Sequence, residues 1–390
     1  MKYRHLHWLV VTAAASPLLQ LSRNSIADYP GLQFGADGKF SISVFSDMHL
    51  GETTSFGPGK GPSADLKTIG VMKSVLDNEK PNMVVLNGDL FTCEAVSSGD
   101  ALRLTDQIAA PLVERNLPFA ATFGNHDMSD TCDTRAVSEH MWSSIKGNNG
   151  QKLSFTTSSV PGPYNEVGTS NYFVPIYASK DATKIAMMLW FFDSKGAPCT
   201  NNTVDDKVLS WFTSTRDAIQ QQQGRVVPSL AFVHIPLFIT RAIQFERDPA
   251  TAPGLTNGEL IDHEGNLCDK DGKCKYKALD VSFLLALDGT KGLMAVFSGH
   301  NHGIDWCAKW SHDLPHNSRD TGSLNFCSNR RTGYGGYGDF IRGGRQIVVD
   351  EGRIDDKIVD TWVRLEDGRI SGQVTLNSTF GKDRYPLVNE

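Results

Sequence analysis

Three adjacent side chains at the end of one apolar run have the types needed for chemistry. Asn125, His126 and Asp127 follow residues 118–122, which have the pattern of a buried strand. The amide oxygen of Asn125 can bind a metal ion, and the imidazole of His126 can move a proton near neutral pH. The carboxylate of Asp127 could fix the tautomer of that imidazole. This stretch predicts a site that combines metal binding with proton transfer.

Four other strand-like runs also end in potential metal ligands. In chain order these ligands are Asp47, His49, Asp89, His234, His300 and His302. Alone, the groups at Asp47, Asp89 and His234 are better explained as turns or core residues. The pair His300 and His302 is more specific, because two alternate imidazoles are seldom needed for packing, and five groups at successive strand ends are not explained by coincidence. Carboxylate and amide oxygens mixed with imidazoles suit Zn, Mn or Fe. With Asn125 the set exceeds the needs of one tetrahedral ion and fits two ions that share a carboxylate. Two ions about 3.5–4 Å apart can activate a bridging hydroxide for in-line attack at phosphorus.

The elements between these ligands predict an α/β fold. Strand-like runs at 40–45, 83–86 and 118–122 alternate with helical patterns, which favours parallel strands. The first helix is expected to start at Ser63 as N-cap and to turn Leu66 inward. Residues 237–277 are irregular and charged and read as a surface insertion. Because the candidate ligands extend from Asp47 to His302, one catalytic domain is the economical interpretation, with its site at the carboxyl ends of the strands.

Composition restricts the class of partner. The chain of 390 residues is 40% hydrophobic and 21% charged, which is typical of a globular protein. Its formal net charge is −6 and it has no basic run, so we expect no nucleic-acid partner. This acidity does not conflict with a phosphorylated substrate, because bound cations can supply local positive charge.

The termini and cysteines indicate the secretory pathway. Residues 1–27 have the layout of a cleaved signal peptide, which leaves 28–390 as the single domain, and no stable membrane insertion is expected. Seven cysteines favour an oxidising lumen or the extracellular space, and sequons at Asn201 and Asn377 agree with this. The expected disulfides are Cys268–Cys274, Cys307–Cys327 and, as a guess, Cys93–Cys132, with Cys199 left free.

The five ligand groups together resemble those of the calcineurin-like metallophosphoesterases over about residues 40–350. Further likeness around Asp305-Trp306-Cys307 and residues 330–337 is to a secreted, purple-acid-phosphatase-like branch of fungi and plants. The resemblance implies a four-layer αββα sandwich with two mixed sheets and a dinuclear metal site at one edge. It also implies His126 and Asp127 as the proton-donating pair, and two ligand sets that share Asp89. These sets are Asp47, His49, Asp89 and His302 for one metal, and Asp89, Asn125, His234 and His300 for the other.

The expected activity is hydrolysis of phosphomonoesters, with a phosphorylated small molecule or phosphoprotein as substrate. Arg330 and Arg331 could grip a phosphate oxygen by bidentate hydrogen bonds. The alternatives are a phosphodiesterase or nucleotidase of the same fold, or a scaffold without catalysis. The sequence leaves the metal identity and the oligomeric state open.

One departure from the purple enzymes predicts a colourless protein. Those enzymes have a tyrosine ligand three residues after the bridging aspartate, where this chain has Thr92, and a glycine where it has His49. Without a phenolate the iron-loaded, oxidised protein should show no tyrosinate-to-iron band in its visible spectrum. A band of the purple type would show that the ligand set is misassigned.

Overall fold

The structure, a computed structural model, describes residues 31–52, 61–196, 201–268, 273–310 and 324–388. The predicted signal peptide at 1–27 and Cys199 lie outside these residues. Among the described residues, no helix is both long enough and apolar enough to cross a bilayer.

The first sheet carries three of the five predicted ligand groups. Its strands β1, β2 and β3 are parallel, whereas β12, β13 and β14 pair antiparallel beyond β1. In spatial order the strands are β14 (Ile370–Leu376), β13 (Val359–Leu365), β12 (Gly343–Asp350), β1 (Lys39–Phe45), β2 (Met83–Asn87) and β3 (Phe119–Thr122). The sheet is therefore mixed, with its parallel half closest to the predicted site.

The second sheet has the same mixed character. Strands β11, β9, β6 and β5 run parallel, and β10 and β4 are antiparallel edges. Its spatial order is β10 (Cys307–Lys309), β11 (Asn325–Ser328), β9 (Leu293–Ser298), β6 (Ser229–Val233), β5 (Asp181–Phe192) and β4 (Tyr172–Ala178). Strands β6 and β9 end at the two remaining ligand groups.

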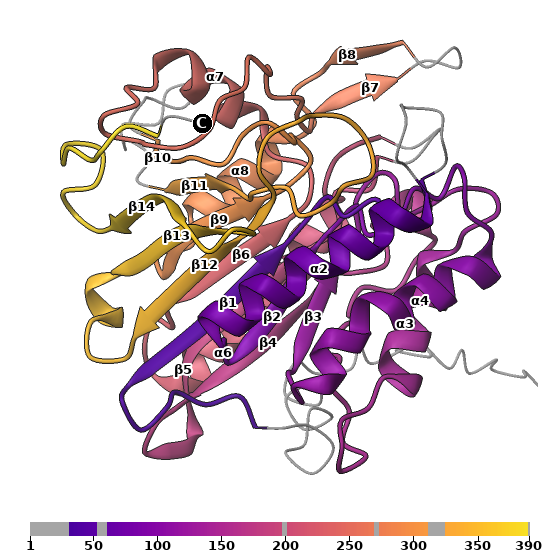
Figure 1. The fold of residues 1–390 in the computed structure, drawn as a ribbon. Helices are drawn as coiled ribbons and strands as arrows, with labels where there is room; N and C mark the ends of the chain where they lie inside the picture. Colours follow the sequence, from indigo (N-terminus) through magenta and orange to yellow (C-terminus); the bar gives the residue numbers. More distant parts are fainter. Residues whose placement is uncertain (1–30, 53–60, 197–200, 269–272, 311–323, 389–390) are drawn as a thin grey trace, which may run out of the picture.

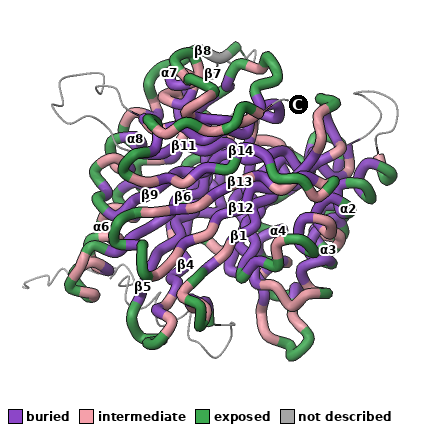
Figure 2. Tube along the Cα trace, turned by 60° about the vertical axis from the view of Figure 1, so that its left-hand side comes forward, coloured by how far each residue is buried: buried purple, intermediate pink, exposed green. Residues whose placement is uncertain are grey.

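The two sheets pack face to face and helices cover their outer faces (Figure 1). Side chains such as Ile42 and Val85 of the first sheet meet Leu189 and Phe232 of the second in one buried core. The strands are largely buried, and exposed residues gather on the loops and outer helix faces (Figure 2). The first sheet is covered by α2 (Pro62–Glu79), α3 (Ser98–Glu114) and α4 (Thr134–Ser144), and the second by α6 (Asp206–Gln223) and α8 (Val281–Asp288). The predicted four-layer αββα sandwich is confirmed.

Two local predictions for α2 are wrong. The helix begins at Pro62 with Gly61 at the N-cap, and Ser63 lies inside its first turn. Proline is favoured at the first helical position because its missing N–H would have no intrahelical partner there. Leu66 is 69% exposed, because the buried stripe follows Asp65, Ile69 and Met72 instead.

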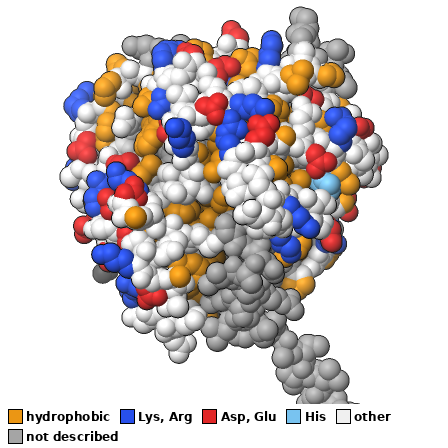
Figure 3. Space-filling view, turned by 60° about the horizontal axis from the view of Figure 1, so that its bottom comes forward, with side chains coloured by type: hydrophobic (Ala, Val, Ile, Leu, Met, Phe, Trp, Pro, Cys, Tyr) orange, Lys and Arg blue, Asp and Glu red, His pale blue; other side chains and the backbone are white. Residues whose placement is uncertain are grey.

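The segment 237–277 is more ordered than predicted. It contains α7 (Phe238–Glu246) and the short hairpin of β7 (Asn266–Cys268) and β8 (Cys274–Tyr276). The short helix α5 (Tyr164–Val167) and the 3-10 turn Ile354–Asp356 complete the described elements. On the face shown in Figure 3, acidic and basic side chains are interspersed.

Two of the three expected disulfides are confirmed. Cys93 is bonded to Cys132, and Cys307 is bonded to Cys327 across β10 and β11. Cys268 and Cys274 are backbone partners across the β7–β8 hairpin, but their side chains lie outside the described part of the chain.

Glu264 generates a prediction about stability. Its side chain is buried, and burial together with the nearby Asp280 carboxylate raises its pKa well above the usual value. A carboxyl group with a raised folded-state pKa stabilises the fold below its unfolded pKa of about 4.3, and this contribution is lost as pH rises towards the folded pKa. Glu264→Gln should therefore raise the melting temperature by a few degrees at pH 7 and by less near pH 4. Thermal melts across this range test it, with exposed Glu139→Gln as control; equal shifts at both pH values would contradict it.

Candidate metal centre

The loops after five strands bring the predicted ligands together at one edge of the sandwich. Two groups have donor atoms within 4.8 Å of one another, and Asp89 belongs to both. The first group is Asp47, His49, Asp89 and His302, and the second is Asp89, His234 and His300. The arrangement matches two metal positions that share one carboxylate.

Distances between donor atoms converge on Asp89 and Asp47. Asp89 Oδ2 lies 3.1 Å from His234 Nε2 and 3.5 Å from His49 Nε2. His302 Nε2 lies 3.7 Å from Asp47 Oδ1 and 3.1 Å from His49 Nε2. Nitrogens from separate histidines therefore converge on one region around these two carboxylates.

Three of the imidazoles are held through their second ring nitrogen. His234 Nδ1 contacts the Asn87 carbonyl oxygen at 2.8 Å, and His49 Nδ1 contacts Thr92 Oγ1 at 3.1 Å. His300 Nε2 lies 3.5 Å from the Asp262 carboxylate. Partners of this kind set the ring orientation of metal-binding histidines. Thr92, at the position where the purple enzymes have tyrosine, thus supports a ligand.

The backbone at the ligands is unusual. Asp47, His49, Asp89 and His300 all have positive φ, at 54°, 48°, 52° and 72°. Residues other than glycine rarely adopt this region, and such conformations cluster at functional sites. Gly88, directly before Asp89, also has positive φ, and a Cβ there would collide with the His234 ring.

Loop-to-loop hydrogen bonds hold these turns in place. The amides of Met48 and His49 donate to the Asp89 carbonyl at 2.8 and 3.0 Å, and the His300 amide donates to Asp47 Oδ1 at 2.8 Å. The loops after β1, β2 and β9 therefore stabilise one another through these hydrogen bonds.

The pKa shifts of three ligands, His49, His302 and Asp89, suit cation binding. Burial holds the pKa of His49 and that of His302 well below the usual value, with the charge of Arg331 acting in the same direction. Burial would raise the pKa of Asp89, but His234 and His126 keep it well below normal. Neutral imidazoles and an ionised carboxylate are the forms that bind metals.

Unpartnered buried atoms support the same assignment. Asn125 Oδ1 and His302 Nδ1 are buried without a hydrogen-bond partner among the described residues. Burial would lower the pKa of His234, but the Asp89 and Asp47 carboxylates raise it to about 10, so a proton and a metal ion compete for its Nε2. The residues present therefore fit two metal ions.

His126 lies beside the ligands with its ring partly exposed. Its amide donates to Asp89 Oδ1 at 2.9 Å, and its ring centre is 5.1 Å from that of His49. Burial would lower its pKa, but the carboxylates of Asp89 and Glu94 raise it to about 9. The His126 imidazole therefore borders the centre with carboxylates that favour its protonated form.

The prediction that Asp127 orients the His126 imidazole is wrong. The Asp127 carboxylate is buried and accepts hydrogen bonds from the amides of Leu90, Phe91 and Gly124 at 2.7, 3.1 and 2.7 Å. It turns back into the loop because these buried amides need an acceptor. Glu94 contacts His126 Nδ1 instead, at 2.8 Å. No motif in the sequence marked Glu94, since the contact arises where two loops meet.

The predicted phosphate grip by Arg330 is also wrong. Its guanidinium is fully buried and donates to Asp305 at 2.7 Å and to the Ile341 carbonyl. Arg331 is equally buried and donates to the Tyr337 carbonyl. This conformation therefore gives neither arginine a surface open to phosphate.

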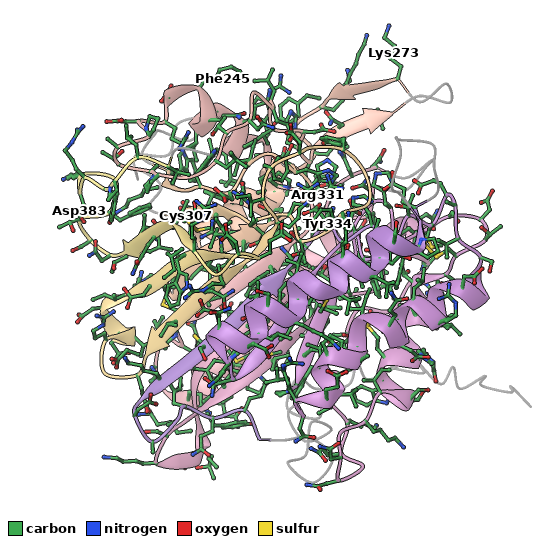
Figure 4. All side chains as sticks on the ribbon, in the orientation of Figure 1. Phe245, Lys273, Cys307, Arg331, Tyr334 and Asp383 are labelled. Atoms are coloured by element: carbon green, nitrogen blue, oxygen red, sulfur yellow. A yellow bond between two sulfur atoms is a disulfide. The ribbon has the colours of Figure 1, made fainter. Side chains whose placement is uncertain are left out.

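Residues 330–338, where Figure 4 labels Arg331 and Tyr334, form a loop that contacts the ligand turns. The amides of Thr332 and Gly333 donate to the carbonyls of Ser46 and Asp47 at 3.0 and 3.1 Å. Tyr337 stacks on His302 with ring centres 4.4 Å apart, and its hydroxyl lies 3.2 Å from Glu259. The C-terminal third of the chain thus supports ligands that come from the first sheet and from β9.

Residues 40–303 match the sequence pattern described as calcineurin-like phosphoesterase, which is more than half of the chain. The chain belongs to the calcineurin-like phosphoesterase family. It is thus a hydrolase of phosphoric ester bonds.

Relatives with this fold come from plants, yeast and fish. The chain is 26% identical to "Probable inactive purple acid phosphatase 29" of Arabidopsis thaliana, over 90% of this chain and 89% of the relative. It is 28% identical to "Phosphatase DCR2" of Saccharomyces cerevisiae. That alignment covers 86% of this chain and 55% of the yeast protein. A dimetal phosphatase from Danio rerio aligns with a TM-score of 0.51 at 12% identity, over 87% of this chain and 98% of that one. This last likeness concerns the fold alone.

The shared carboxylate generates a direct test. Asp89→Ala should reduce metal binding from two ions per chain to at most one and remove nearly all activity, because both ligand groups lose a member. Elemental analysis of purified protein and a phosphatase assay measure this. Asp130→Ala, on the exposed part of the 127–133 loop, is the control. Full activity of wild-type protein with a single ion, or after metal removal, would refute the two-metal centre.

Proposed function

We propose that this protein is a secreted, metal-dependent phosphomonoesterase acting on a phosphorylated small molecule or phosphoprotein. The observation that carries the proposal is the pair of ligand groups sharing Asp89, with the imidazole of His126 beside them. Two disulfides among the described residues support a secretory route.

The residues of the site have two proposed roles, metal binding and proton donation. Asp47, His49 and His302 would hold one ion, Asn125, His234 and His300 the other, and Asp89 both. When bound, the two ions supply Lewis acidity for the phosphoryl group and lower the pKa of water. His126 donates a proton from Nε2 to the departing oxygen of the ester. The mixed oxygen and imidazole ligands leave Fe, Zn and Mn as candidates for the two metal ions.

The word "inactive" in the names of the plant relatives belongs to those proteins. Here all seven ligand positions and His126 have side chains suited to their roles. A scaffold without catalysis would not need five strained or buried ligands around one carboxylate. These features favour an enzyme.

The first experiment compares one monoester with one diester on metal-loaded protein. We expect hydrolysis of p-nitrophenyl phosphate to exceed that of bis-p-nitrophenyl phosphate by a factor of at least about 10. The reverse preference would make the protein a phosphodiesterase. No hydrolysis of either ester by protein containing two ions per chain would refute the proposal.

His126→Gln tests the proton donor. General-acid help is worth about 10²–10⁴ in rate, and it matters most for a poor leaving group. The variant should lose a factor in this range on an alkyl phosphate and much less on p-nitrophenyl phosphate, with its metals retained. His140→Gln, a partly buried histidine paired with Asp106, is the control. Equal losses on both substrates would instead make His126 a hydrogen-bond donor to the phosphoryl oxygens.

A further inference from the structure

The partner of the His126 imidazole comes from a different loop. Glu94 Oε1 lies 2.8 Å from His126 Nδ1, and the two side chains are 43% and 39% exposed. A carboxylate only accepts hydrogen bonds, so this contact places a proton on Nδ1. The second nitrogen, Nε2, takes no part in this contact.

The two loops are tied together next to this contact. Cys93, the neighbour of Glu94, forms a disulfide with Cys132 and donates its amide to the His126 carbonyl at 2.9 Å. Ser129 Oγ donates to the Cys93 carbonyl at 2.9 Å. An exposed ion pair normally contributes little, because ordering two long side chains costs entropy. Here the backbones on both sides are already held, which reduces that cost.

We propose that Glu94 is a positioning residue for His126 and that the Cys93–Cys132 disulfide keeps it in place. This inference rests on the proposed function. In the hydrolysis, an oxygen from water bonds to phosphorus while the P–O bond to the alcohol breaks. The proton on His126 Nε2 passes to the departing oxygen. His126 is then a neutral imidazole whose Nδ1–H still donates to Glu94. The attacking water releases its proton to solvent, and His126 Nε2 regains a proton from solvent.

Kinetics separate positioning from a structural role. Glu94→Ala should lower kcat about 10- to 100-fold on an alkyl phosphate and less than about threefold on p-nitrophenyl phosphate, with KM and metal content unchanged. Glu94→Gln keeps an acceptor oxygen and should recover part of the loss. Glu139→Ala, which replaces an exposed glutamate on α4, should leave kcat unchanged on both substrates. If Glu94→Ala lowers kcat equally on both substrates, or on neither, the proposal is overturned.

The disulfide has a matched control in the same chain. Replacing Cys93 and Cys132 by alanine should reduce the ratio of alkyl to aryl phosphate rates in the same direction as Glu94→Ala. Replacing Cys307 and Cys327, which join β10 to β11, should lower stability but leave this ratio unchanged. The same ratio in both double variants would refute a positioning role for the Cys93–Cys132 bond.

A measurement without turnover separates failure of this inference from failure of the proposed function. In proton NMR at low temperature, the His126 Nδ1–H should give a downfield resonance that is absent in both His126→Gln and Glu94→Ala. Persistence of that resonance in Glu94→Ala would refute the contact. If wild-type protein hydrolyses neither ester, the proposed function fails, and the resonance still decides whether Glu94 holds the imidazole.

Discussion

The structure around the centre depends on one buried carboxylate, that of Asp89. Its oxygens lie 3.1 Å from His234 Nε2 and 2.9 Å from the His126 amide, and its backbone has a φ of 52°. A carboxylate taken out of water is costly unless donors or cations surround it. Donors for Asp89 come from the loops after β3 and β6, so two sheets must be packed before the charge is compensated. Formation of the candidate metal centre therefore depends on the packing of the two sheets.

The sheets supply the required positions because of their topology. Parallel strands end at the same edge, and β1, β2 and β3 face β6 and β9 across a shared apolar core. The ligand turns have strained backbones, and their mutual hydrogen bonds, such as the His300 amide to Asp47, offset that strain. Rigid strands beneath strained turns hold the ligands in place before any ion binds.

Groups from remote segments then orient the side chains that matter. Asp262, from the segment before β7, faces His300, and Tyr337, from the loop before β12, stacks on His302. Glu94 and the adjacent disulfide do the same for His126. Residues outside the candidate ligand set thus orient the imidazoles of the site.

The sequence by itself indicated an α/β fold and seven candidate ligands, because apolar runs ending in Asp, Asn and His carry both signals locally. The four-layer αββα arrangement was implied by the resemblance to a known family. The sequence also indicated the two disulfides found among the described residues. The partners of those residues were decided only by the tertiary structure. Asp127 was expected to hold His126, yet it turns towards the amides of Leu90 and Phe91, and Glu94 takes its place. Arg330 was expected at the substrate, yet it neutralises buried Asp305. Side-chain type follows from sequence, whereas the partner of a charge depends on which loops folding brings within about 3 Å.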